Sequence, residues 1–374
     1  MTGTLSPAEL RDRVRGCLLG GAVGDALGAP VEFLSLAEIR ATFGSEGVAD
    51  YAEAYGQRGA TTDDTQMTLW TVEGLIRADN RFRTRGICHM PSVVHRAYLR
   101  WLATQEGVGP LQRNNPDMGD LVTGWVWGQP VLHARRAPGN TCLSALRLGK
   151  MGEIEHPIND SKGCGGIMRV APIGLVTKDP FGFGCEIAAL THGHPSGYLA
   201  AGAFALIVAK SFRGRPLTEA INAALNELRR IPGHDETSHT IEKARHLAAL
   251  GHIEPESVER LGAGWVAEEA LAIALYCALV ARDFRSGVLL AVNHGGDSDS
   301  TGSLTGQLLG VQGGEAVIPT RWLVALEGRD VIEQVAEDLS RHFVDRPQAP
   351  PMPKDWPMGE SWPQPDDLDR YPPN

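Results

Sequence analysis

Two short acidic segments constrain the fold of this chain more than any other feature. Residues 61–65 read TTDDT and residues 295–302 read GGDSDSTG, so each packs carboxylates and hydroxyls into a few positions without Cys or His. Oxygen ligands at this density suit Mg²⁺, Mn²⁺ or Ca²⁺ better than Zn²⁺ or copper. If the fold brings the segments together, the converging carboxylates need cations to neutralise them. The pattern therefore predicts a catalytic metal centre, and we expect it to hold two ions.

A simpler interpretation of each acidic segment is a helix cap. The apolar rhythm of residues 66–79 and 301–309 predicts that a helix follows each segment. Acids and hydroxyls at a helix start satisfy free backbone N–H groups and interact favourably with the helix dipole. One such cap is common, whereas two caps with paired acids and hydroxyls favour a shared ligand. The sequence pattern alone leaves both interpretations open.

The chain is expected to be all-α, because short alternating runs of Val, Ile and Thr bounded by turns are scarce. Ser6, Pro7 and Glu9 predict the start of a first helix that runs through Ala26 and stops before Pro30. Its many glycines predict close backbone packing. Further helices are expected near residues 92–105, 140–149, 183–191, 195–211, 217–230, 238–250, 265–282, 284–292, 300–311 and 329–343.

Composition divides the 374 residues into a single helical domain and a tail. Residues 1–345 are expected to form one compact domain, in which the Gly-, Pro- and Trp-rich interval 107–137 is an ordered loop. Residues 346–374 are rich in Pro and Trp and cannot form a regular helix. Because a disordered tail seldom carries so many aromatic residues, we expect Trp356, Trp362 and Tyr371 to pack on the body.

Charge and cysteine usage exclude several classes of protein. A net charge of -10 argues against a general nucleic-acid binder, which needs a basic face. The six cysteines form no CxxC pair and are expected to be reduced thiols of a cytoplasmic protein. The sequence predicts neither a signal peptide nor a membrane-spanning segment. It carries no feature that fixes an oligomeric state.

Two carboxylates near the end of the first helix are further candidates. Glu32 lies between apolar residues, where a carboxylate needs a cation or a hydrogen-bond donor as a partner. It is therefore a candidate for a group that lies beside a metal or activates water. Asp25 is either an acid supporting the metal centre or a polar group at the helix end.

A glycine-rich segment and a pair of histidines are candidates for substrate contacts. Residues 162–169 (KGCGGIMR) predict either a turn whose backbone N–H groups bind phosphate or a tight helix contact. Cys164 within it is expected to be structural. His192 and His194 lack the further ligands of a zinc site, so we expect one of them to line a polar pocket.

Taken together, the motifs resemble the ADP-ribosylglycohydrolase family. The matching segments, which follow the order found in that family, are GCLLGGAVGDALGAPVEF (16–33), TTDDTQMTL (61–69), PGNTC (138–142), GCGGIMRVAPIGL (163–175), THGHPSGYLA (191–200) and GGDSDSTG (295–302). The resemblance implies a compact all-α fold with a dinuclear Mg²⁺ or Mn²⁺ site at helix ends. The metal ligands that it implies are Thr62, Asp63, Asp64, Asp297, Asp299 and Ser300.

The resemblance also implies roles for other residues. The implied catalytic residues are Glu32, Asp63 and Asp297. The implied substrate-binding residues are Asn140, Gly163, Gly165, Gly166, His192 and Tyr198, of which Tyr198 is either an adenine-stacking or a core aromatic. The chain departs from the family pattern where Ser300 replaces Thr, which keeps the hydroxyl, and where Cys164 replaces Asn.

The implied activity is metal-dependent hydrolysis of the glycosidic bond between ADP-ribose and an acceptor, with ADP-ribosylated protein arginine as the first expectation. O-linked or small ADP-ribose adducts are the alternative substrates. A protein that binds and inhibits an ADP-ribosyltransferase, a crystallin-like structural protein and a phosphate-ester hydrolase are the rival classes. Four converging carboxylates favour catalysis over a structural role, because they are electrostatically costly to keep.

Overall fold

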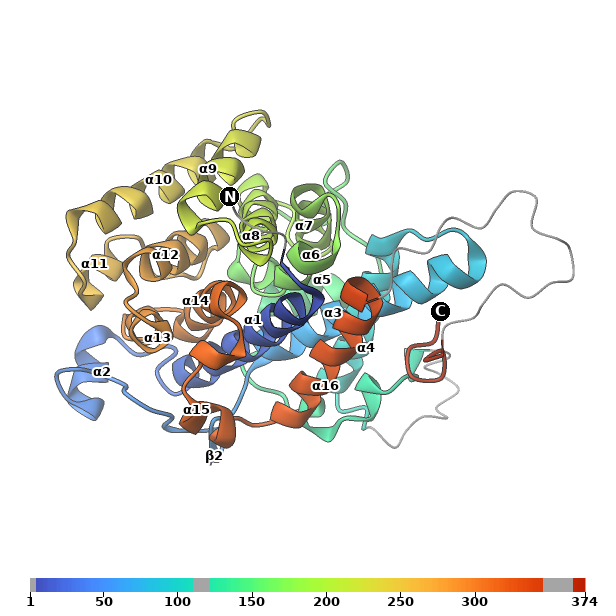
Figure 1. Ribbon diagram of the computed structural model, residues 1–374, viewed down its shortest axis with the longest axis horizontal. Helices are drawn as coiled ribbons and strands as arrows, with labels where there is room; N and C mark the ends of the chain where they lie inside the picture. The colour runs from blue at the N-terminus through green and yellow to red at the C-terminus, as the bar shows by residue number, and fades with distance from the viewer. Residues whose placement is uncertain (1–4, 110–120, 346–365, 374) are drawn as a thin grey trace, which may run out of the picture.

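The computed structural model describes residues 5–109, 121–345 and 366–373, which form one all-helical domain (Figure 1). The helices of the first half are α1 (Pro7–Gly28), α2 (Leu36–Phe43), α3 (Asp63–Arg85), α4 (Met90–Gln105), α5 (Asn140–Arg147), α6 (Ala171–Val176) and α7 (Pro180–Ala189). Those of the second half are α8 (Pro195–Phe212), α9 (Leu217–Leu228), α10 (Asp235–Leu250), α11 (Pro255–Glu259), α12 (Ala267–Val280), α13 (Phe284–Val292), α14 (Ser298–Gly313), α15 (Thr320–Ala325) and α16 (Arg329–Ser340).

Shorter elements connect these helices. Strands β1 (Glu53–Ala54) and β2 (Gln57–Arg58) form a small antiparallel hairpin in which Glu53 lies opposite Arg58. The short helical turns are η2 (Val126–Gly128), η3 (Pro130–His133), η4 (Cys164–Gly166), η5 (Glu315–Val317) and η6 (Arg341–Asp345). Within the described ranges this two-stranded hairpin is the only β-sheet, so the all-α expectation is confirmed.

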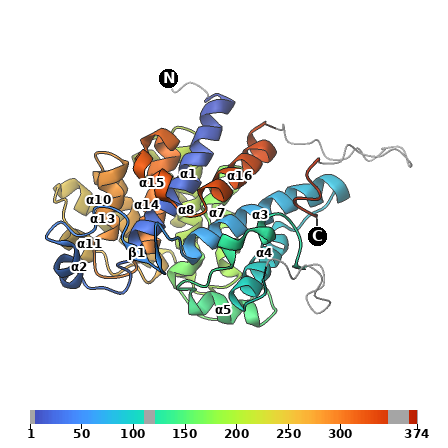
Figure 2. The same ribbon diagram turned by 90° about the horizontal axis from the view of Figure 1, so that it is seen from below.

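A glycine stripe lets α1 and α14 pack with their backbones in close contact, and the two helices lie side by side in Figures 1 and 2. A Cβ atom on Gly20 would overlap the carbonyl of Gly306, and one on Gly24 would overlap the carbonyl of Gly302. The helices run antiparallel, because Gly16 faces Gly310 at the opposite end of the contact. The carboxyl end of α1 therefore lies against the amino end of α14.

The first helix begins as its sequence predicts. Ser6 and Glu9 form a reciprocal capping box, and Pro7 occupies the first helical position. The expected helices correspond to observed ones, with ends that differ by a few residues. Helices α2, α6, α11 and α15 are additional to those expected. They span only five to eight residues, too few for the apolar rhythm of a helix to stand out.

Helix α8 is a core helix. By length and mean hydropathy (1.2) it could cross a membrane, but 78% of its residues are buried inside the protein. It packs against α6, α7, α9 and α12, which accounts for its apolar composition.

Parts of the two irregular segments are visible. The described part of the interval 107–137 contains η2 and η3. Near the C-terminus, Tyr371 is buried and donates a hydrogen bond of 2.7 Å to Asp338. Trp356 and Trp362 lie outside the described residues.

Candidate active site

The two acidic segments meet in one cavity of about 400 Å³. Five carboxylate residues line this cavity, and they come from the turn after α1 and from the starts of α3 and α14. They are Glu32, Asp63, Asp64, Asp297 and Asp299. The predicted meeting of the segments is therefore observed. The glycine contact holds the end of α1 against the start of α14, and Asp25 of α1 is hydrogen-bonded to the segment that starts α3.

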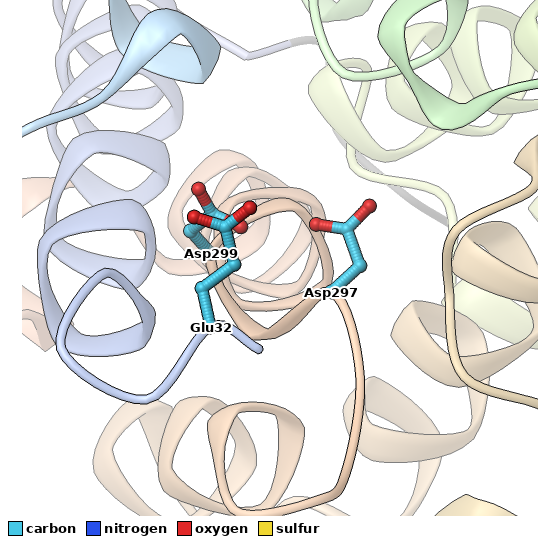
Figure 3. Close-up of side chains that lie close together, drawn as sticks. All are labelled: Glu32, Asp297 and Asp299. Atoms are coloured by element: carbon cyan, nitrogen blue, oxygen red, sulfur yellow. The ribbon is translucent and has the colours of Figure 1, made fainter. Parts of the chain in front are cut away.

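Three of these carboxylates form a tight cluster, which we call the acidic triad: Glu32, Asp297 and Asp299 (Figure 3). One oxygen of each lies within 4.8 Å of the corresponding oxygens of the other two. The turn after α1 holds Glu32 in place, since the N–H groups of Val31 and Glu32 both donate to the carbonyl of Gly28 at 2.9 Å.

Asp63 and Asp64 approach the triad from the first turn of α3. Asp64 accepts a hydrogen bond of 3.2 Å from the hydroxyl of Ser300, which directly links the two acidic segments. Asp63 accepts one of 3.1 Å from the N–H of Gly139 on the opposite wall. Acids in the first turn of a helix also interact favourably with its dipole, so the cap interpretation and the shared site are compatible.

Asp25 joins α1 to the start of α3. Its buried carboxylate accepts hydrogen bonds from the backbone N–H and the hydroxyl of both Thr62 and Thr65. The Thr62 hydroxyl is therefore directed at Asp25, and Thr62 does not line the cavity. In this structure Thr62 stabilises the helix start that carries Asp63 and Asp64.

The cavity strongly disfavours negative charge in the absence of cations. Burial, followed by the charge of Asp299, raises the pKa of Asp25 to about 7 although four donors favour its ionised form. The same causes raise the pKa of Glu32 to about 11 and those of Asp63, Asp64 and Asp297 well above their ordinary values. Bound cations would reduce this repulsion between buried carboxylates.

The donor set fits a hard divalent cation. Glu32 Oε2 and Asp64 Oδ1 are buried and have no hydrogen-bond partner among the described residues. Buried carboxylate oxygens without a partner are costly, and a cation would satisfy both. Because the carboxylates and the hydroxyl of Ser300 offer only oxygen, the site suits Mg²⁺, Mn²⁺ or Ca²⁺.

The glycine-rich segment forms one wall of the cavity, but part of its backbone is already engaged. The N–H of Gly163 donates to Ser161 Oγ at 3.3 Å, and the N–H of Cys164 donates to the carbonyl of Trp265 at 3.1 Å. Gly165 lines the cavity and Gly166 does not. Any backbone contact with a phosphate therefore centres on Gly165 more than the sequence indicates.

The other substrate-contact candidates divide into two groups. Asn140, at the start of α5, and His192 both line the cavity. Tyr198 does not; it lies on α8, partly buried against the hydrophobic core. The structure thus favours the core interpretation of Tyr198.

Sequence reasoning missed several residues that line the cavity. The thiol of Cys164, which we expected to be structural, donates to Asp297 Oδ2 at 2.7 Å. Phe33 and Trp265 stack at the rim with ring centroids 5.3 Å apart and exposed fractions of 67% and 41%. Arg135 adds a cation. Phe33, a large aromatic residue directly after Glu32, was the one sequence signal that could have indicated this rim.

Comparison with known proteins identifies the family. The model of the ADP-ribosylglycohydrolase family matches residues 6–349. The chain belongs to the ADP-ribosylglycohydrolase family. It is 30% identical over 339 residues to an uncharacterized protein of Archaeoglobus fulgidus, covering 88% of this chain and 96% of that protein. It is 27% identical over 326 residues to the ADP-ribosyl-[dinitrogen reductase] glycohydrolase of Rhodospirillum rubrum, covering 85% and 92%.

A solved structure shares this fold of the ADP-ribosylglycohydrolase family. The structure of an ADP-ribosylglycohydrolase-related protein complex has a TM-score of 0.62 and 29% sequence identity to this chain. The match covers 90% of this chain and 99% of the solved one. The all-helical single-domain architecture is therefore that of the family.

Proposed function

We propose that this protein hydrolyses the glycosidic bond between ADP-ribose and a protein side chain, with the help of two bound Mg²⁺ or Mn²⁺ ions. The observation that carries the proposal is the convergence of five carboxylates in a cavity of about 400 Å³. The proposed metal ligands are Asp63, Asp64, Asp297, Asp299 and Ser300, with Thr62 in support behind them. When bound, such ions hold vicinal hydroxyls and lower the pKa of a nearby water.

The protein's own residues would transfer the proton, stabilise the transition state and bind the diphosphate. Glu32 is a member of the triad with an unpaired carboxylate oxygen, so we assign it the role of the base that accepts the proton of the attacking water. We assign Asp63 and Asp297, which line the cavity, to the stabilisation of an oxocarbenium-like transition state by their negative charge. Arg135 and Gly165 line the same cavity, and we assign them to the binding of the diphosphate of ADP-ribose.

The aromatic rim supports arginine as the acceptor. A guanidinium is planar and cationic, and it stacks on aromatic faces while favouring nearby carboxylates. Phe33 and Trp265 offer such faces beside Glu32. Phe33 also adopts a left-handed backbone conformation (φ 70°), a strained state that points to a positional requirement. An acceptor linked through a serine oxygen gains nothing from this rim.

The first experiment incubates the purified protein with arginine-ADP-ribosylated protein, with Mg²⁺, with Mn²⁺ or with a chelator. We expect free ADP-ribose to be released only with metal, and Asp299→Asn to abolish the release. Asp235→Asn is the matched control, because Asp235 occupies the first turn of α10 but is exposed. Release that persists in Asp299→Asn or in chelator would refute the proposal. Tight binding to a transferase without release would favour the inhibitory class.

A second experiment tests the acceptor. Trp265→Ala is expected to lower kcat/KM on the arginine adduct several-fold while changing turnover of a serine-linked adduct little, since a cation–π contact is worth about 0.5–1 kcal/mol at an exposed site. Equal losses on both adducts would place the rim against the ADP-ribose itself and overturn the arginine argument. Parallel assays on small ADP-ribose adducts and on phosphate esters cover the remaining substrates.

A further inference from the structure

A buried arginine behind the glycine-rich wall lacks an acidic partner. Arg169 is fully buried, and the contacts of its guanidinium nitrogens within the described residues are two sulfur atoms, a carbonyl and a hydroxyl, with no carboxylate among them. Its guanidinium lies over the ring of Tyr98, 4.1 Å from the centroid. Its Nη2 donates to the carbonyl of Ile187 at 3.3 Å and to the hydroxyl of Thr191 at 2.6 Å. Burying a charge without a partner of opposite charge is costly, which suggests that Arg169 has a functional role.

The bond to Thr191 fixes the direction of the next hydrogen bond. A guanidinium can only donate, so the Thr191 oxygen accepts from Arg169. The same oxygen lies 2.8 Å from Nδ1 of His192, where either atom could be the donor. In the described part of the chain the Thr191 hydroxyl has no other acceptor, so its proton is directed at Nδ1. Nδ1 must then be unprotonated and accept this bond.

The opposite nitrogen of His192 faces the cavity wall. Burial, with a smaller contribution from Arg169, lowers the pKa of His192 to about 3, so the ring is neutral at pH 7. A neutral imidazole whose Nδ1 accepts must carry its proton on Nε2. A Cβ on Gly163 or Gly165 would lie 3.4 Å from Nε2, which places this atom directly behind the glycine-rich wall. His192 itself lines the cavity.

We propose that Arg169 is a positioning residue that acts through Thr191 to hold His192 as the Nε2–H tautomer, so that a neutral donor is presented to the cavity. The arrangement explains why Arg169 lacks a carboxylate partner, since an acid at that point would compete for its N–H groups. It also supplies a hydrogen bond to a phosphoryl or hydroxyl oxygen without adding charge near the carboxylates. The identity of that oxygen as part of ADP-ribose rests on the proposed function, whereas the tautomer does not.

The test begins with the unmodified protein. ¹⁵N-histidine labelling and long-range ¹H–¹⁵N NMR at pH 7, with His192→Asn to assign the signal, report which nitrogen of His192 is protonated. We expect protonation at Nε2 and an unprotonated Nδ1. Protonation at Nδ1, or a mixture of tautomers, overturns the proposal whatever the variants do.

Two variants of Thr191 then separate positioning from packing. Thr191→Val keeps the shape but removes the hydroxyl, and it should shift the tautomer and weaken ADP-ribose binding about five- to tenfold, the worth of one hydrogen bond. Thr191→Ser should restore both. A Ser variant that behaves like Val, or a Val variant with the wild-type tautomer, contradicts the relay. If the wild-type protein fails to bind ADP-ribose, the proposed function fails while the tautomer result stands.

Discussion

Replacing Gly24 by alanine tests how the fold places the site. A Cβ at this position would overlap the carbonyl and the carbonyl carbon of Gly302, which are backbone atoms of α14. Backbone cannot rotate away as a side chain can, so α1 and α14 must move apart. Because the carboxyl end of α1 lies against the amino end of α14, this shift would move Glu32, which follows α1, away from Asp297 and Asp299 at the start of α14.

The expected magnitude follows from two opposing effects. Alanine is favoured over glycine inside a helix by about 1 kcal/mol. Overpacking a tight contact costs about 1–3 kcal/mol and more when rigid backbone is involved. We therefore expect a net loss of about 1–2 kcal/mol in the free energy of unfolding, together with weaker Mn²⁺ binding.

Gly21→Ala is the matched control for Gly24→Ala. It lies in the same helix and gains the same helical propensity, but its Cβ would meet side-chain atoms of Gln307 where that of Gly24 would meet backbone atoms of α14. Urea denaturation and calorimetric Mn²⁺ titration of both variants give the comparison. Equal stability and equal Mn²⁺ affinity in Gly24→Ala and the wild-type protein would refute the argument that this contact builds the site.

Three further predictions concern charge and the C-terminal segment. Without divalent ions, the protein should lose stability as pH rises from 7 to 8.5. The pKa of Glu32 is raised to about 11 in the folded protein, so the folded chain keeps a proton that the unfolded chain releases near pH 4.5. Such a group lowers the free energy of unfolding by up to about 1.4 kcal/mol for each pH unit. Thermal melts with chelator and with Mn²⁺ check this, and a slope unaffected by Mn²⁺ counts against it. Asp64→Asn should stabilise the chelated protein, because it removes a carboxyl whose ionised form is disfavoured by burial and by the charge of Asp299, yet abolish Mn²⁺ binding by calorimetry; a destabilised chelated variant contradicts this. Tyr371→Phe leaves the buried Asp338 without one donor and should cost about 1–2 kcal/mol in urea denaturation while the proposed activity is retained; an unchanged midpoint would speak against this contact.

Much of the fold and the centre of the site could be predicted from local patterns. The acid-hydroxyl segments, the glycines of the first helix and the capping box at Ser6 each carry their own physical signature. The glycines predicted close packing, but not that α14 would be the partner. That pairing depends on complementary backbone surfaces of segments far apart in the chain, which periodicity does not report.

The rest of the site depends on contacts that no local motif encodes. Cys164 was expected to be structural, yet it meets Asp297 because an isolated bridge pairs Gly163 with Val266. The same bridge carries Trp265 to the rim. The resemblance implies that Thr62 is a metal ligand, and the fold adds a hydrogen bond from its hydroxyl to Asp25. In each case a tertiary contact decided the role of a side chain whose chemistry was already evident.

Anomalous diffraction from crystals soaked in Mn²⁺ tests the central claim most directly. The account predicts two peaks in the cavity, bounded by the acidic triad on one side and by Asp63 and Asp64 on the other. Saturating Mn²⁺ without a peak at these carboxylates, or with peaks only elsewhere on the protein, would contradict it.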